Sequence, residues 1–134
     1  MPSIRPGVHG EFSMLVTHEV AVDFLGVEGA RILGTPYLIG YLELTARNAV
    51  KGLLEAGQDT VGTHVDVRHL AATPLGMSVR FHARVTDVQD RRIRFHLEAH
   101  DEKEKVAEGT HERAIVTVSR FVEKLAAKRK AAGV

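Results

Sequence analysis

The spacing of hydrophobic residues changes along the chain, and each change marks a different kind of element. Residues 12–20 alternate between hydrophobic and polar side chains, which is typical of a strand with one buried face. In residues 37–56 hydrophobic side chains recur at intervals of three and four, which predicts one amphipathic helix. The helix is expected to begin at Thr35 and Pro36, where a hydroxyl can cap the helix and proline suits the first turn, and to end at Gly57.

After Gly57 the hydrophobic period returns to two and predicts successive antiparallel strands joined by short turns. The first of these strands, residues 61–69, is expected to place five side chains on one face: Val61, Thr63, Val65, Val67 and His69. Three further strands are predicted at residues 77–85, 93–99 and 106–118. A short basic helix over residues 121–130 closes the chain.

The order of these elements indicates a fold class. A single long helix with an apolar face needs a partner surface, and one antiparallel sheet with an apolar face supplies it. The sequence therefore predicts one α+β domain over residues 1–134, with a curved antiparallel sheet wrapped around one long central helix. The hotdog fold has this description, although another α+β sandwich could produce the same order of elements.

The composition narrows the classes of function. Eighteen basic and 17 acidic residues give a net charge of +1, so no global charge favours nucleic acid or an anionic membrane as a partner. The chain has no cysteine, which excludes disulfides, thiolate metal sites and a cysteine nucleophile. No hydrophobic run has the length of a signal peptide or a bilayer span, and we expect a cytoplasmic protein with no membrane partner.

The sequence contains none of the common signatures of a cofactor or metal site. It has no Gly-x-Ser-x-Gly elbow, no Walker A loop and no dinucleotide fingerprint. No pair of histidines has the spacing of a zinc motif, and His64 and His69 are expected on opposite faces of their strand. We therefore expect neither a cofactor nor a metal ion.

Two stretches of sequence, residues 67–76 and 109–114, resemble the fluoroacetyl-CoA thioesterase family. The resemblance extends over roughly residues 34–125 and implies a hotdog homodimer, or a higher oligomer, that hydrolyses acyl-CoA thioesters without a cofactor. Thr35, Glu43 and His69 match the catalytic threonine, glutamate and histidine of the family. The site of such dimers is expected at the subunit interface, so that Thr35 and Glu43 of one chain would meet His69 of the other.

Each of these three residues also has a purely structural interpretation. On spacing alone, Thr35 is more typical of a helix N-cap than of a catalytic group. Glu43 lies on the flank of the apolar stripe, where it could be partly desolvated and functional or could pair with Arg47 one turn later. A lone histidine on an apolar strand face, such as His69, is usually a hydrogen-bonded core residue, and the resemblance makes it the preferred proton donor or acceptor.

Two further residues are predicted to contact substrate or support the site. Gly62 matches the family's glycine, and its residue type fits either a β-bulge or a close approach of substrate to the backbone. Arg113 belongs to the second motif and could pair with a carboxylate, although a solvated strand arginine is nearly as good an interpretation.

Two departures from the family limit what the resemblance implies. The fluoroacetyl-specific enzyme has a long aromatic-rich insert before its threonine, whereas residues 21–34 alone bridge that interval here. Pro36 lacks the backbone N–H that could help to bind an oxyanion. We therefore expect a thioesterase that is not specific for fluoroacetyl-CoA. A hotdog hydratase or dehydratase and a non-catalytic acyl-CoA-binding module are the two alternatives.

Overall fold

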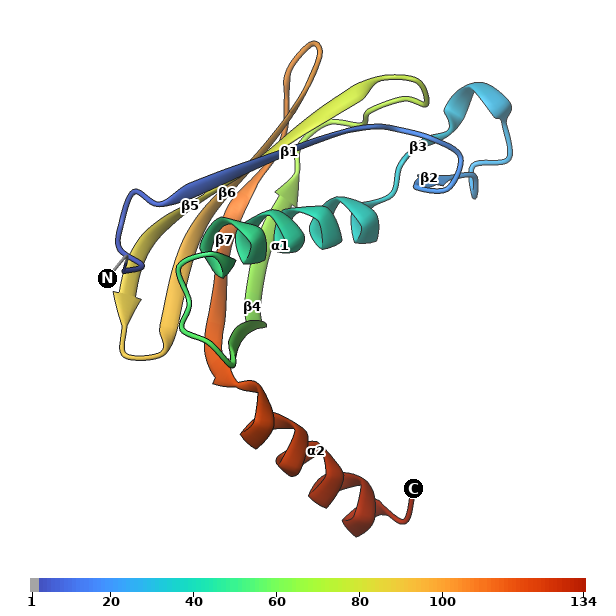
Figure 1. Ribbon diagram of the computed structural model, residues 1–134. Helices are drawn as coiled ribbons and strands as arrows, with labels where there is room; N and C mark the ends of the chain where they lie inside the picture. Colours follow the sequence, from blue (N-terminus) through green and yellow to red (C-terminus); the bar gives the residue numbers. More distant parts are fainter. Residues whose placement is uncertain (1–2) are drawn as a thin grey trace.

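The computed structural model describes residues 3–134, and it consists of a curved antiparallel sheet that wraps around one helix (Figure 1). The sheet has five strands in the order β1-β5-β6-β7-β4, and all neighbouring strands are antiparallel. Its strands are β1 (His9–Leu15), β4 (Gln58–His69), β5 (Ser78–Gln89), β6 (Arg92–Asp101) and β7 (Lys105–Thr117). The central helix is α1 (Thr35–Lys51), and the predicted α+β architecture is confirmed.

The core lies between the inner face of the sheet and one side of α1. Leu38, Leu42, Ala46 and Val50 of the helix are fully buried, at the intervals of three and four that the sequence shows. The alternate residues of β5 and β6 meet them, and all of these are fully buried: Val79, Phe81, Ala83, Val85, Ile93, Phe95, Leu97 and Ala99. The opposite face of the sheet therefore carries the polar side chains of these strands.

The central helix begins at Thr35 as predicted, but its end and the bounds of the C-terminal helix differ from the sequence interpretation. The helix α1 ends at Lys51 rather than near Gly57, so Leu53 and Leu54 follow it in a turn. Hydrophobic spacing alone does not show this end, because the two leucines continue the helical spacing in the sequence. The C-terminal helix, α2 (Val118–Ala132), is longer than predicted and projects away from the sheet (Figure 1).

The strand β4 contains a β-bulge that changes which of its residues face the helix. Its pairing with β7 shifts between Gly62 and His64, so one extra residue is inserted there. The prediction that Val61 and Thr63 share the inner face is therefore wrong, because Thr60 and Gly62 take those places. Beyond the bulge, Val65, Val67 and His69 have inner-face partners on β7, as predicted.

The first strand and the turn after β5 also differ in their bounds from the sequence prediction. The first strand was expected at residues 12–20, but β1 begins at His9 and its pairing with β5 ends at Leu15. The turn between the strands predicted at residues 77–85 and 93–99 is reduced to Asp90 and Arg91, because β5 continues through a second bulge to Gln89. Asp90 has a φ of 54°, a value that aspartate tolerates in tight turns.

A short segment with secondary structure that the sequence did not predict precedes α1. It contains β2 (Ala21–Val22), the short 3-10 helix η1 (Glu28–Ala30) and β3 (Ile32–Leu33), with β2 paired to β3. This segment lies beside the start of α1 (Figure 1). Within residues 3–134, no helix is both long and apolar enough to cross a membrane.

Candidate active site

Thr35 and His69 form a direct pair at the start of α1. The hydroxyl oxygen of Thr35 lies 2.8 Å from Nδ1 of His69, at the end of β4, and the two share a hydrogen bond. The interpretation of Thr35 as an N-cap is wrong, because Gly34 occupies the N-cap position and no side chain caps the helix. The threonine hydroxyl is therefore directed toward the imidazole rather than toward the backbone of its own helix.

The surroundings of His69 favour the neutral form of its imidazole. Burial lowers the pKa of its imidazole below the ordinary value, because the charged form loses hydration. Its Nε2 is buried and has no hydrogen-bond partner among residues 3–134. A buried polar atom without a partner is costly, so a group that binds to it gains free energy from satisfying it.

Glu43 belongs to a second group of residues, about two turns further along α1. Its carboxylate accepts a hydrogen bond from Nη1 of Arg113 at 3.3 Å, and 42% of its side chain is exposed. A Cβ atom placed on Gly62 would lie 2.9 Å from Oε2 of Glu43, so a larger residue there would displace the carboxylate. Gly62 thus lies immediately before the bulge and provides the backbone surface on which Glu43 rests.

Arg113 is held in place by groups that the sequence did not reveal. Its side chain is only 5% exposed, so the interpretation of a solvated arginine is wrong. Its Nε donates to the hydroxyl of Thr60 at 2.7 Å and its Nη2 donates to the carbonyl of Thr60 at 2.8 Å. The guanidinium is therefore fixed on two sides and presents Nη1 to Glu43.

His111 is the functional candidate that sequence reasoning missed. Its Nδ1 lies 2.7 Å from the carbonyl oxygen of His64, which requires a proton on Nδ1, and its Nε2 then accepts from Nη1 of Arg113 at 3.2 Å. Burial lowers the pKa of His111, which keeps the ring neutral beside the arginine. Two features of the sequence could have identified His111. It lies two residues before Arg113, on the same face of the strand, and it belongs to the motif at residues 109–114.

The alternative pairing of Glu43 with Arg47 is not found. Arg47 instead forms a two-point interaction with Asp59 at 3.0 and 2.6 Å, which joins α1 to the start of β4. This hydrogen bonding lowers the pKa of Asp59 to about 2. Glu43 is left with Arg113 as its partner.

Within one chain, the candidate residues form two separate groups. Eight residues separate Thr35 from Glu43 in the same helix, which corresponds to about 12 Å along its axis. The expectation that Thr35 meets His69 only across subunits is therefore wrong, because these two residues pair within one chain. Glu43, Gly62 and Arg113 form the other group, and neither group alone contains all the predicted catalytic residues.

The lowered pKa values of His69 and His111 predict a pH-dependent stability. Both groups bind protons more weakly in the folded than in the unfolded chain, so they favour folding above pH 6.5 and oppose it as the pH falls through their folded-state pKa values. We expect the melting temperature, at fixed protein concentration, to decrease between pH 7.5 and pH 5. A melting temperature that is constant or increases toward pH 5 would contradict the prediction.

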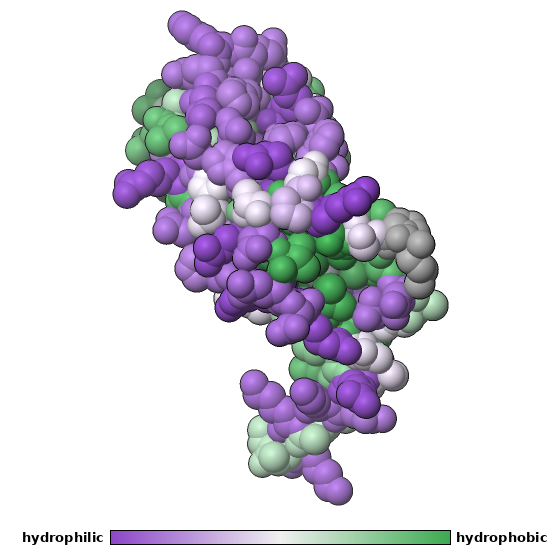
Figure 2. Space-filling model, turned by 90° about the vertical axis from the view of Figure 1, so that its left-hand side faces the viewer, coloured by the Kyte–Doolittle hydropathy of each residue, from purple (hydrophilic) through white to green (hydrophobic). Residues whose placement is uncertain are grey.

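A hollow with a partly apolar lining lies at the opposite end of α1. It has a volume of about 420 Å³ and is lined in part by Ile4, Leu53, Val88 and Ile115. Figure 2 shows hydrophobic side chains gathered on this side of the molecule, next to the beginning of the described chain. Neither Thr35 nor Glu43 lines this hollow, so it is separate from the candidate site.

The sequence is similar to that of one family of thioesterases. The sequence profile of a family described as fluoroacetyl-CoA-specific thioesterase matches residues 16–119. The fluoroacetyl-CoA thioesterase of Streptantibioticus cattleyicolor is 34% identical over 104 residues, which cover 78% of this chain and 75% of that protein.

Solved structures agree with the sequence comparison. A variant of the fluoroacetyl-CoA-specific thioesterase, in complex with fluoroacetate and CoA, superposes with a TM-score of 0.80 at 30% identity and covers 88% of this chain and 99% of its own. A hot-dog-like protein from Thermanaerovibrio acidaminovorans has a TM-score of 0.85 at 22% identity over 93% of both chains. The fold is therefore the hotdog fold, as predicted.

Proposed function

The chain belongs to the fluoroacetyl-CoA-specific thioesterase family, and from this premise we propose that it hydrolyses acyl-CoA thioesters to a free acid and CoA. The observation that carries the proposal is the hydrogen bond between Thr35 and the partly buried His69, whose second nitrogen is unsatisfied. The hydroxyl of Thr35 can interact with the substrate carbonyl. The neutral imidazole of His69 can carry the proton that the departing thiolate needs.

Thioester hydrolysis requires a nucleophile, a proton for the departing thiolate and donors near the carbonyl oxygen. Glu43 is assigned as the base that activates water, or as the nucleophile itself, because Arg113 and Gly62 hold its carboxylate while part of it faces solvent. His69 delivers a proton to the departing thiolate. Thr35 and the start of α1 position and polarise the carbonyl, where the helix dipole favours developing negative charge.

The substrate-binding role predicted for Arg113 is better assigned as support. Its guanidinium is almost fully buried and its donors are directed to Thr60, His111 and Glu43. We assign it to orienting the Glu43 carboxylate. Gly62 is assigned to seating the Glu43 carboxylate, because a side chain at position 62 would displace it.

The two groups of residues come together in a homodimer. Within residues 3–134, β4 is paired on one side only, and an unpaired edge strand favours association with a second copy. Large hydrophobic side chains near this edge and on α1 are exposed: Tyr37, Leu44, Val65 and Leu70. Burying these side chains against the same surface of a second copy would stabilise the dimer.

An antiparallel pairing of β4 with its copy explains how the site is completed. A two-fold axis near the middle of the segment from Gly62 to His69 reverses the order of residues in the second strand. Gly62 of one chain, with Glu43 resting on it, would then lie beside His69 of the partner subunit. Each dimer would contain two sites, each with Glu43 from one chain and the Thr35–His69 pair from the other.

The proposed activity is tested with a thiol-release assay over a panel of acyl-CoA thioesters. Release of CoA in proportion to enzyme concentration supports hydrolysis. Hydration of an enoyl-CoA without thiol release would replace the proposal with a hotdog hydratase. Binding of acyl-CoA without any turnover would replace it with a binding module.

Substrate preference is expected to differ from that of the fluoroacetyl-specific relative. Residues 21–34 contain Gly26 and Gly29, at which an added Cβ would meet no atom within 4 Å, and the side chain of Phe24 is 78% exposed. In one chain, this segment therefore provides little material to enclose a two-carbon acyl group. We propose that the site is not fluoroacetyl-specific and expect kcat/KM for hexanoyl-CoA or benzoyl-CoA to exceed that for fluoroacetyl-CoA.

This expectation follows because a hydrophobic pocket distinguishes only weakly between acyl groups of similar size. One methylene changes binding by about 1–3 kcal/mol, so strict selection of a small halogenated acyl group needs a dedicated enclosure. Phe24→Ala is the matched variant, and it should leave the ranking of substrates unchanged. A preference of about a hundredfold or more for fluoroacetyl-CoA over every larger acyl group, lost in Phe24→Ala, would show instead that this segment closes the pocket.

A further inference from the structure

The outer face of the sheet, away from the helix, carries a cluster of metal-ligating side chains outside the candidate active site. His96, Glu98 and His100 alternate along β6 with the buried core residues, so all three are on this outer face. Glu108 of β7 lies directly opposite Glu98 in the strand register. One potential ligand atom each from His96, Glu98 and Glu108 lies within 4.8 Å of the other two.

The distances within the cluster are close to those of a coordinated ion. Nε2 of His96 is 3.3 Å from one carboxylate oxygen of Glu98, and Nε2 of His100 is 3.4 Å from the other. Bonds of about 2.0–2.2 Å in tetrahedral geometry place neighbouring ligand atoms about 3.4 Å apart. The ligand atom of Glu108 lies within 4.8 Å of the other two and would move closer when an ion binds.

The position of Lys105 indicates that this site favours a cation. The glutamates 98 and 108 face each other across two strands, and like charges in this position repel. Lys105 places its ammonium group against both carboxylates, 3.2 Å from Glu98 and in closer contact with Glu108. The lysine therefore neutralises the two facing carboxylates, and a metal ion bound between them would compete with it.

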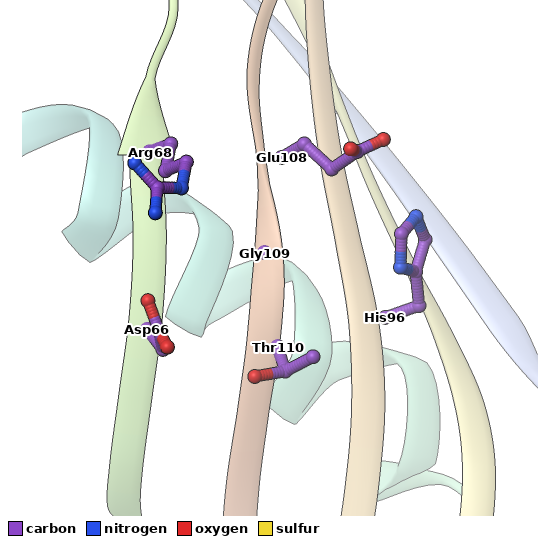
Figure 3. A pocket seen from close by; sticks show the side chains of 6 residues that line it. All are labelled: Asp66, Arg68, His96, Glu108, Gly109 and Thr110. Atoms are coloured by element: carbon purple, nitrogen blue, oxygen red, sulfur yellow. The ribbon is translucent and has the colours of Figure 1, made fainter.

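We propose that His96, Glu98 and Glu108 form a binding site for a single divalent transition-metal ion of the Zn²⁺ type, in competition with Lys105. Imidazole with carboxylate suits Zn²⁺, Cu²⁺ or Ni²⁺, whereas Mg²⁺ and Ca²⁺ prefer oxygen ligands alone. The ion has access from solvent, because His96 and Glu108 also line a surface hollow of about 290 Å³. Figure 3 shows Glu108 extending from β7 toward β6, above the ring of His96.

An ion bound here would link β6 to β7 and stabilise the sheet. The motif was not visible in the sequence, because the ligands are two residues apart on one strand and are completed by a residue on the next strand. The site does not depend on the proposed esterase activity, because none of its ligands contacts Thr35, Glu43 or His69 among the described interactions.

The test is isothermal titration of the purified, metal-stripped full chain with Zn²⁺, with Mg²⁺ titrated in parallel. We expect one Zn²⁺ per chain and no comparable Mg²⁺ binding. His96→Ala and Glu98→Gln should each weaken Zn²⁺ binding by roughly tenfold or more. Lys105→Gln should strengthen it, because the two carboxylates lose their internal cation.

The matched control is His18→Ala, since His18 and Glu28 form a surface pair at 3.6 Å. This variant should bind Zn²⁺ as the parent does. At a hundredfold excess of Zn²⁺ over its Kd, the melting temperature of the parent should rise by roughly 5–10 °C. The proposal is overturned if no Zn²⁺ binds, if His96→Ala binds it as tightly as the parent, or if Lys105→Gln weakens binding.

Discussion

Glu43→Gln and His69→Ala are each expected to lower kcat/KM for the best acyl-CoA substrate by about a hundredfold or more. Glutamine keeps the size of Glu43 but can neither accept a proton at neutral pH nor attack as a carboxylate. Alanine at position 69 removes the only titratable group in contact with Thr35 among the described residues. Steady-state thiol release, with circular dichroism and light scattering to show an intact fold and assembly, measures the effect.

Thr35 provides a graded comparison in the same assay. Thr35→Ser should retain more activity than Thr35→Val, because the proposed role needs only the hydroxyl that bonds to His69. As a control, Arg92→Ala changes an exposed arginine on β6 and should leave kcat/KM near the parent value. Losses of only a few-fold in both Glu43→Gln and His69→Ala would assign these residues to structure rather than catalysis.

The architecture could be read from the sequence because burial repeats with a simple period. Residues such as Leu38, Leu42 and Ala46 recur at helical spacing, and Phe81 and Ala83 alternate as a half-buried strand requires. Such patterns report which face is buried. They report the ends of elements less well, since Leu53 continues the helical spacing after α1 has ended at Lys51.

The site was only partly predictable, for two physical reasons. A β-bulge puts the residues before it out of phase with those after it, so the alternation that correctly placed Val65 and His69 assigned Val61 rather than Thr60 to the inner face. Thr60 is consequently the residue that holds Arg113. The role of His111 depends on a carbonyl 47 positions away in the sequence, and no local pattern encodes such a contact.

The family match and the contacts between residues bear on different aspects of function. The family match applies to the chain as a whole, whereas the contacts divide its candidate residues into a Thr35–His69 pair and a Glu43–Arg113 pair. Hydrolysis at one site needs both pairs close to the same thioester. The proposed shared site of a dimer would satisfy this requirement without moving either pair from its observed partners.

A shared site predicts that two inactive variants restore activity to each other. In a heterodimer of a Glu43→Gln chain with a His69→Ala chain, one site receives Glu43 from the second chain and His69 from the first, and the other site receives both substitutions. We expect such a heterodimer to have about half the wild-type kcat, since one of its two sites is intact. The chains would be co-expressed with different affinity tags, purified through both tags and assayed for thiol release.

The same experiment separates this arrangement from a site within one chain. If each chain formed its own site, both sites of the heterodimer would carry one defect, and its activity would stay near that of the homodimeric variants. The dimer itself is checked by light scattering, which should give about twice the chain mass of 14.7 kDa. A fully active monomer, or a heterodimer no more active than its parents, would show that Glu43 and His69 of the same chain act together, and α1 would then have to move relative to β4 during catalysis.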